Sequence, residues 1–168
     1  TERIEDVLAN IFPEARVARM DLDTTRSRSA YEGIIKGFQR GDTDILIGTQ
    51  MVTKGLDFRK VSVVGILNAS TMLNQPDFRS YERAYQMMTQ VAGRAGRSAG
   101  SADQSVRPGH VILQVHDGGQ PTVLQVVRGD YEAMFRTQME ERRLFSYPPV
   151  CRLVYVYMKH KDETVLDH

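Results

Sequence analysis

Short apolar segments alternate with amphipathic segments along this chain, and this alternation constrains its fold more than any other feature. Residues 44–48 and 61–67 are nearly continuous apolar runs of the kind that parallel sheets bury on both faces. Shorter strands are predicted over residues 16–20 and 110–115. Strands that alternate with helices indicate an α/β protein, with an open parallel sheet flanked by helices and right-handed crossovers.

The helical segments show apolar residues at spacings of three and four. Helices are predicted over residues 2–12, 28–40, 78–92 and 121–143. Ser29 and Glu32 fit a capping box in the second helix, and Gly41 is expected to end it. The third helix is expected to bury one face, made by Tyr81, Ala84, Tyr85, Met88 and Ala92. The fourth is predicted as one long helix with a buried stripe of Leu124, Val127, Tyr131, Met134 and Phe135.

Composition sets limits on function. The 168 residues carry a net charge of +1, so any binding of anions must be local and not the result of a global positive field. Cys151 is the single cysteine, which excludes a disulfide framework or a cysteine zinc site within the chain and suits a reducing cytoplasm. No apolar run approaches the roughly 20 residues that span a membrane.

Residues 90–97 hold the strongest candidate for a functional site. Arg94 and Arg97 are each preceded by a glycine, Gly93 and Gly96, directly after the third predicted helix. Glycine permits turn geometry and close approach of a large anion, and the guanidinium forks match phosphate oxygens. A helix end with a glycine stop and two solvated arginines is the alternative interpretation.

A polar loop, Gly48–Phe58, follows the apolar strand at residues 44–48. Ligands of open parallel sheets gather at the carboxyl ends of the strands. The segment 90–97 follows the helix after the next strand, and we expect it to reach the same edge of the sheet.

Two chemistries fit this pair of segments. Gln90, Arg94 and Arg97 suit the terminal phosphates of a nucleotide, where phosphoryl transfer depends on positioning and neutralisation of charge. Thr49 and Gln50, with neighbouring backbone amides, suit a nucleic-acid backbone bound without reading its sequence. The chain lacks a G-x-x-x-x-G-K-[ST] loop and an acidic pair on a strand, so it offers half of an ATPase site and needs a partner lobe.

Other polar residues have simpler interpretations. Asp21 and Asp23 follow a strand and are expected to form a turn, not a metal site. Cys151 is expected to be a packed thiol. The histidines show no ligand spacing, so metal binding by His110, His116, His160 and His168 is not expected.

Two charged segments are expected to be solvated. Arg79, Glu82 and Arg83 are interpreted as an exposed helix face, with an interlobe contact as the alternative. Residues 140–143 are interpreted as a charged helix end.

The two candidate segments resemble conserved helicase motifs. Residues 45–58 look like motif V of superfamily 2 helicases, and residues 90–97 look like motif VI. Within that superfamily the chain resembles the primosomal protein N′ family, the PriA replication-restart helicases. The residues that carry this narrower resemblance are Arg19–Thr25, Asp77–Ser80 with Glu82 and Arg83, Glu141–Arg143 and Tyr147–Pro149.

The resemblance implies a bacterial DNA helicase that reopens stalled forks and moves 3′ to 5′ using ATP and Mg²⁺. Residues 1–120 would then be its second RecA-like lobe, incomplete at the N-terminal edge, and residues 121–149 a long helix and linker. Residues 150–168 would begin a further α+β domain with a strand at Arg152–Lys159. The implied partners are the first helicase lobe in cis, single-stranded or forked DNA, and other primosome and single-strand-binding proteins. Zinc is implied for the intact family protein but not for this chain.

The resemblance also assigns roles by position. Arg94 and Arg97 would be arginine fingers, and Gln90 would contact the γ-phosphate or its attacking water. Gly93 would approach the same nucleotide. Gly55 and Asp57 would lie at the nucleotide edge, and Thr49 and Gln50 would lie nearest the DNA. Lys54 could face either the nucleotide or the DNA. A non-catalytic RecA-like scaffold that binds nucleic acid or protein stays open as an alternative, as does a motor that acts on duplex DNA or RNA.

Overall fold

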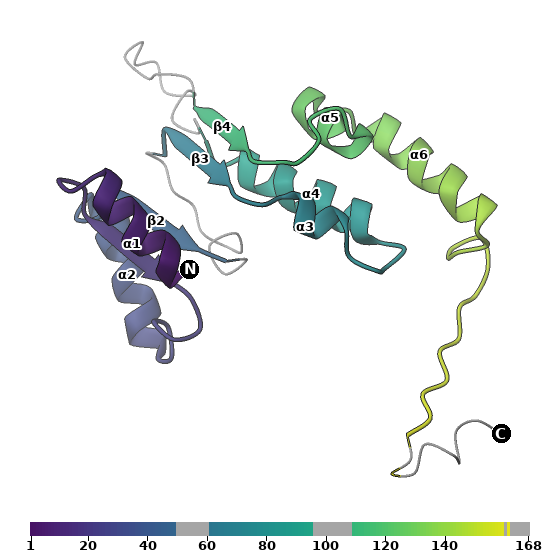
Figure 1. Ribbon diagram of the computed structural model, residues 1–168, viewed down its shortest axis with the longest axis horizontal. Coiled ribbons are helices and arrows are strands. Elements are labelled where there is room, and N and C mark those ends of the chain that lie inside the picture. Colours follow the sequence, from purple (N-terminus) through teal and green to yellow (C-terminus); the bar gives the residue numbers. More distant parts are fainter. Residues whose placement is uncertain (50–60, 96–108, 160, 162–168) are drawn as a thin grey trace.

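The computed structural model of the protein describes residues 1–49, 61–95, 109–159 and 161 (Figure 1). Helices and parallel strands alternate in this part of the chain, so the predicted α/β class is confirmed. The elements, in order, are α1 (Glu2–Ile11), β1 (Val17–Met20), α2 (Arg28–Arg40), β2 (Ile45–Gly48), β3 (Val63–Ile66), α3 (Ser70–Leu73), α4 (Ser80–Ala92), β4 (His110–Leu113), α5 (Pro121–Arg128) and α6 (Tyr131–Leu144).

The described strands form two parallel pairs and not the single sheet expected. β1 pairs with β2, with Met20 opposite Gly48, and β3 pairs with β4, with Ile66 opposite Leu113. No backbone pairing joins β2 to β3 among the described residues. The apolar pattern of a strand reports its burial but not its neighbours, so the sequence predicted parallel strands without fixing which of them pair.

The β1–β2 pair has a small core of its own. Met20 is fully buried and packs against the apolar stripe of α2, which is Tyr31, Ile34, Ile35 and Phe38. Val61, just before β3, also packs on this cluster and so links the two halves of the chain. On α1, Glu5 pairs with Arg19 of β1, with Oε2 3.2 Å from Nε.

The ends of α2 test the capping prediction. Ser27 is the N-cap, and its hydroxyl accepts a hydrogen bond from the Ala30 amide at 3.2 Å. The predicted box of Ser29 and Glu32 is therefore wrong, because Glu32 instead pairs with Arg28 at 3.0 Å. Gly41 ends the helix with a left-handed φ of 86°, as predicted.

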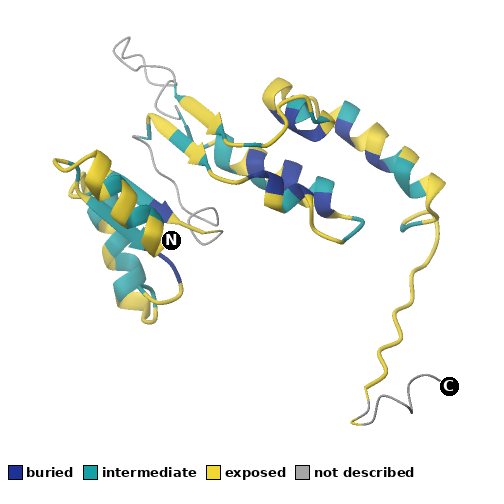
Figure 2. Ribbon diagram, in the orientation of Figure 1, coloured by how far each residue is buried: buried dark blue, intermediate teal, exposed yellow. Residues whose placement is uncertain are grey.

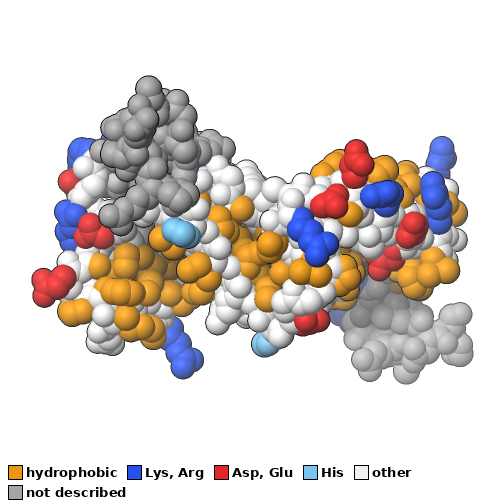
Figure 3. Space-filling view, turned by 90° about the horizontal axis from the view of Figure 1, so that it is seen from above, with side chains coloured by type: hydrophobic (Ala, Val, Ile, Leu, Met, Phe, Trp, Pro, Cys, Tyr) orange, Lys and Arg blue, Asp and Glu red, His pale blue; other side chains and the backbone are white. Residues whose placement is uncertain are grey.

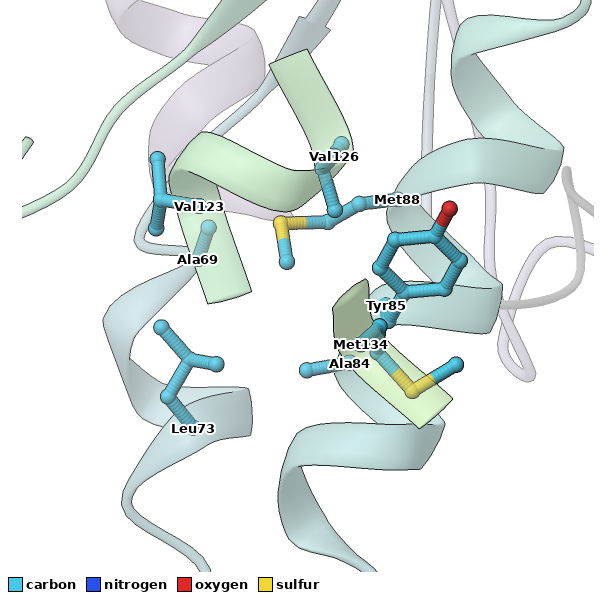
Figure 4. Close-up of a cluster of buried hydrophobic side chains, with 8 residues drawn as sticks. All are labelled: Ala69, Leu73, Ala84, Tyr85, Met88, Val123, Val126 and Met134. Atoms are coloured by element: carbon cyan, nitrogen blue, oxygen red, sulfur yellow. The ribbon is translucent and has the colours of Figure 1, made fainter. Parts of the chain in front are cut away.

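A larger core joins the helices that surround β3 and β4. Eight buried side chains form it, contributed by the segment 69–73, α4, α5 and α6 (Figure 4). Ala84, Tyr85 and Met88 supply the face of α4 that the sequence predicted, and Tyr81 packs at its margin. This packing fixes α4, the helix that precedes the arginine segment.

The predicted long helix at 121–143 is two helices. Gly129 adopts a left-handed φ of 66° and ends α5, and Asp130 begins α6 by accepting a hydrogen bond from the Ala133 amide at 2.9 Å. Because the helix is broken here, the buried residues are not those expected for one continuous helix. Val123, Val126 and Met134 are buried, whereas three residues of the predicted stripe are exposed, namely Val127, Tyr131 and Phe135.

Residues 152–159 do not form the strand expected of them. They are extended and exposed (Figure 2), with Val154 80% and Val156 79% accessible. A strand requires a hydrogen-bonded neighbour, and none of the described segments pairs with this one.

Further apolar surface lies on the β3–β4 pair, where Val63 and Ile112 are exposed, and hydrophobic surface is visible on the face seen in Figure 3. None of the helices in the described ranges is long and apolar enough to cross a membrane.

Candidate nucleotide and nucleic-acid site

The carboxyl end of α4 positions the described part of the arginine segment. Gln90 is exposed in the last turn, and Arg94 lies half-buried just after the helix. The Arg94 and Ala95 amides donate to the carbonyls of Val91 and Ala92, both at 3.1 Å, so the chain leaves α4 in a tight turn.

Gly93 does not need the freedom of glycine for its backbone. Its φ of −65° and ψ of 1° are open to any residue, and its amide bonds to the Thr89 carbonyl at 2.9 Å. A Cβ at this position would lie 3.4 Å from the Thr89 carbonyl oxygen, an ordinary contact. The turn at this position therefore does not require a glycine. The other role expected of Gly93, close approach of an anion, stays a prediction.

Thr49 follows a strand, whereas the arginine segment follows a helix. Thr49 is exposed and directly follows the carboxyl end of β2. In contrast, α4 begins beyond the carboxyl ends of β3 and β4 and runs back toward these strands (Figure 1). Residues 50–60 and 96–108 lie outside the described part of the chain, so the expectation that both candidate segments reach one edge of the sheet stays a prediction.

Five of the predicted site residues lie outside the described part of the chain: Gln50, Lys54, Gly55, Asp57 and Arg97. Gly96 also lies outside it. Their predicted roles stay predictions.

Asp21 has the structural role expected of it. Its Oδ1 accepts hydrogen bonds from the amides of Asp23 at 3.1 Å and Thr24 at 3.0 Å, and its Oδ2 accepts from the Thr1 hydroxyl at 2.6 Å. These bonds, that of Thr1 first, lower the pKa of the Asp21 carboxyl to about 2. A carboxylate held in this way is a turn former.

The described residues do not assemble a metal centre. No group of three His, Cys, Asp or Glu side chains within the described ranges can hold an ion. Gln90 and Arg94 offer an amide and a cation, which suit phosphate oxygens and not Mg²⁺. Cys151 is exposed, so the prediction of a packed thiol is wrong.

A polar cluster between α4 and α6 was not recognised in the sequence. Arg142 of α6 ion-pairs with Glu82 of α4, with side chains only 14% and 32% exposed. Asp77 pairs with Arg83 at 2.6 Å. The prediction of a solvated helix face is therefore wrong for Glu82 but correct for Arg79 and Arg83, which are exposed, and the prediction of a solvated helix end is wrong for Arg142. Sixty positions separate Glu82 from Arg142, and no local pattern signals a contact of that range.

The Phe78 ring lies at the centre of this cluster. It stacks on Tyr147 with ring centroids 5.1 Å apart, and the guanidinium of Arg142 lies 5.5 Å from its centroid. The segments that carried the family resemblance, at 77–83, 141–143 and 147–149, are thus brought together in space.

Parallel strands that alternate with helices make this part of the chain an α/β lobe. Residues 1–99 match the helicase conserved C-terminal domain family, and the chain belongs to that family.

The narrower resemblance, to the primosomal protein N′ family, is confirmed by three relatives that are each a replication restart protein PriA. The chain is 44% identical to the protein of Bacillus subtilis (strain 168) over 162 residues, which are 96% of this chain and 19% of the relative. It is 41% identical to the protein of Chlamydia pneumoniae over 154 residues, with shares of 92% and 20%. For Thermotoga maritima the identity is 31% over 165 residues, with shares of 98% and 21%. The chain thus spans about a fifth of the length of these relatives.

Proposed function

We propose that this chain is the C-terminal motor lobe of an ATP-dependent DNA helicase that restarts stalled replication forks, with 3′ to 5′ movement. The observation that carries the proposal is the arginine turn after α4 in a chain of the helicase C-terminal domain family. The similarity to replication restart proteins over nearly the whole chain supports the assignment to fork restart. The intact protein would act in the bacterial cytoplasm.

In this proposal Arg94 and Arg97 act as arginine fingers, and Gln90 contacts the γ-phosphate or its water. Gly93 allows close approach, and Gly55 and Asp57 lie beside the nucleotide. Hydrolysis of the bond between the β- and γ-phosphates of ATP, to ADP and phosphate, would drive movement, and the first lobe would hold Mg²⁺. The core side chains Ala84, Tyr85 and Met88 pack α4 against its neighbours, and this packing supports a defined position for the turn that carries Arg94. An arginine in this role is worth about 10³- to 10⁵-fold in rate.

Thr49 and Gln50 bind the DNA backbone in this proposal, with Lys54 beside them. The exposed position of Thr49 after β2 supports this role, because hydroxyl and backbone amide groups bind phosphates without reading bases.

The test compares the lobe with the intact enzyme. The 168-residue chain alone is expected to show no DNA-stimulated ATP hydrolysis. In the full-length enzyme Arg97→Ala and Arg94→Ala are each expected to lower kcat by about 10³-fold or more and to spare DNA binding. Arg128→Ala is the matched control, because Arg128 is exposed in the last turn of α5.

Three results would contradict the proposal. Substantial ATP turnover by the isolated chain would show that the half-site argument is wrong. ATP hydrolysis at the wild-type rate in both arginine variants would show that neither arginine acts as an arginine finger. An intact protein that binds DNA but hydrolyses no ATP would favour the non-catalytic scaffold.

A further inference from the structure

The end of α6 contacts the start of α4 in two ways. Arg142 of α6 ion-pairs with Glu82 in the first turn of α4, through Nη2 and Oε2. Tyr147, just beyond α6, stacks on Phe78, which lies just before α4. The Tyr147 amide donates to the Arg142 carbonyl at 2.8 Å, so one turn of the chain presents both side chains. The start of α4 is therefore fixed to a single structural unit.

The segment that leads into α4 is itself ordered around Asp77. Its Oδ1 accepts a hydrogen bond from the Arg79 amide at 2.9 Å, and its carbonyl accepts one from the Ser80 amide at 2.9 Å. Its Oδ2 pairs with Arg83 of α4 at 2.6 Å. Phe78 follows Asp77 directly, so these bonds join the backbone that carries the ring to the first turn of the helix.

The middle of α4 is packed in the core, and its far end leads to the candidate arginine. Ala84, Tyr85 and Met88 of α4 pack in one cluster with Met134 of α6 (Figure 4). Arg94 follows the helix. Contacts at the middle of a helix fix where it lies, whereas a further contact at one end also fixes its direction. The contacts of Arg142 are of this second kind.

The direction of α4 determines where Arg94 lies. Arg94 is roughly 13 Å beyond Tyr85 along the helix axis, at about 1.5 Å per residue. Over that length a tilt of about 4° about the core displaces the turn by about 1 Å. A displacement of 1 Å at a group that acts in a reaction can cost about 10²-fold in rate. A small change at the Arg142 end of the helix is therefore large enough to matter at the other.

We propose that Arg142 is a positioning residue for ATP hydrolysis, which sets the direction of α4 through Glu82 and thereby the place of Arg94. This inference rests on the proposed function, in which Arg94 is an arginine finger. Arg142 itself contacts neither nucleotide nor DNA in this proposal. A contact that only stabilises the lobe is the competing explanation, and the experiment separates the two.

The experiment measures DNA-stimulated ATP hydrolysis by the full-length enzyme, at a temperature well below the unfolding of every variant. Arg142→Gln and Glu82→Gln are each expected to lower kcat by about 10- to 100-fold. The KM for ATP is expected to stay unchanged, because an arginine finger contributes mainly in the transition state. Arg142→Lys keeps the positive charge and is expected to recover most of the rate.

Met20→Ala is the control for stability. Met20 is fully buried in the separate core of β1 and β2, so its truncation is expected to lower Tm at least as much as Arg142→Gln does. It is expected to leave kcat unchanged, because Met20 makes no contact with the core that holds α4. A fall in kcat with Met20→Ala equal to that with Arg142→Gln would show a general effect of stability and would overturn the inference.

A second readout tests whether Arg142 acts through Arg94. The effect of Arg142→Gln is measured again in enzyme that carries Arg94→Ala, by single-turnover hydrolysis with enzyme in excess. If the position of Arg94 is what Arg142 controls, Arg142→Gln is expected to have little further effect in this background. The same fold-loss in both backgrounds would show that the two residues act independently, and the inference would be wrong.

The remaining outcomes separate this inference from the proposed function. If Arg94→Ala abolishes hydrolysis while Arg142→Gln, Arg142→Lys and Glu82→Gln all retain wild-type kcat, the positioning role is wrong and the motor proposal is untouched. If Arg94→Ala hydrolyses ATP at the wild-type rate, the finger role of Arg94 fails, and the positioning role fails with it.

Discussion

The ion pair between Glu82 and Arg142 joins α4 to α6, and its removal is the sharpest test of how this lobe is held together. The Arg142 side chain is 14% exposed and that of Glu82 is 32% exposed, so neither group is fully solvated. The Arg142 guanidinium also lies 5.5 Å from the centroid of the Phe78 ring. We consider three variants: Glu82→Gln, Arg142→Met and the double substitution.

The expected losses in the free energy of unfolding depend on how deeply each side chain of the pair is buried. Removal of one partner of a fully buried pair costs about 3–5 kcal/mol, and exposed pairs are worth about 0.2–1 kcal/mol. Glu82→Gln leaves the less exposed cation unpaired, so we expect a loss of about 2 kcal/mol, reduced from the buried value for partial solvent screening. Arg142→Met keeps most of the side-chain packing and leaves a carboxylate that water can reach, so we expect about 1 kcal/mol. The double variant is expected to lose less than the two single losses combined, with a coupling free energy of about 1–2 kcal/mol.

Urea unfolding followed by far-UV circular dichroism measures these free energies. The matched control is the pair of Arg28 and Glu32 on α2, which are 3.0 Å apart with side chains 92% and 45% exposed. The same substitutions at this control pair are expected to give a coupling of about 0.3–0.5 kcal/mol that disappears in salt. A coupling for Glu82 and Arg142 no larger than the control, with the same response to salt, would refute the claim that burial strengthens this pair.

Three further predictions concern stability. Gly129→Ala is expected to lower the free energy of unfolding by about 1–2 kcal/mol because the φ of Gly129 is 66°. Gly33→Ala is expected to raise it by about 0.5–1 kcal/mol, because Gly33 lies in an exposed helical position with open space around it. Changes of the same sign in urea unfolding would contradict this prediction. The pKa of Asp21 is lowered from 3.8 to about 2, so its contribution is present above about pH 4 and is lost as pH falls toward 2; Asp21→Asn is expected to flatten that part of the stability profile, and an unchanged acid limb would argue against it. Met88→Ala is expected to cost about 2–5 kcal/mol in thermal or urea unfolding because Met88 is fully buried, while Met158→Ala, at an exposed position, is expected to change stability by less than about 0.5 kcal/mol.

Local chemistry predicted much of the secondary structure. Gly41 and its left-handed φ end α2 where the sequence indicated, and the apolar runs around Ile45 and Val63 are strands. The buried face of α4 was predictable from the sequence because side chains three and four residues apart share one side of a helix. These features depend on residues close in sequence, so a pattern of a few positions suffices to predict them.

The break at Gly129 shows where local patterns mislead. Apolar residues continue at helical spacing on both sides of it, so periodicity alone joined α5 to α6. A glycine followed by an aspartate marks this boundary, because Gly129 adopts the left-handed conformation and Asp130 caps α6. The error moved Val127, Tyr131 and Phe135 from the surface into a predicted core.

The sequence by itself determined the α/β class, the family and the types of residue available for phosphate binding. These depend on local periodicity and on motifs whose residues are close together along the chain. Only the tertiary structure decided that Glu82 meets Arg142 and that Phe78 stacks on Tyr147. Such contacts depend on the direction in which each helix crosses its strands and on packing between distant segments, which no short pattern of residues encodes.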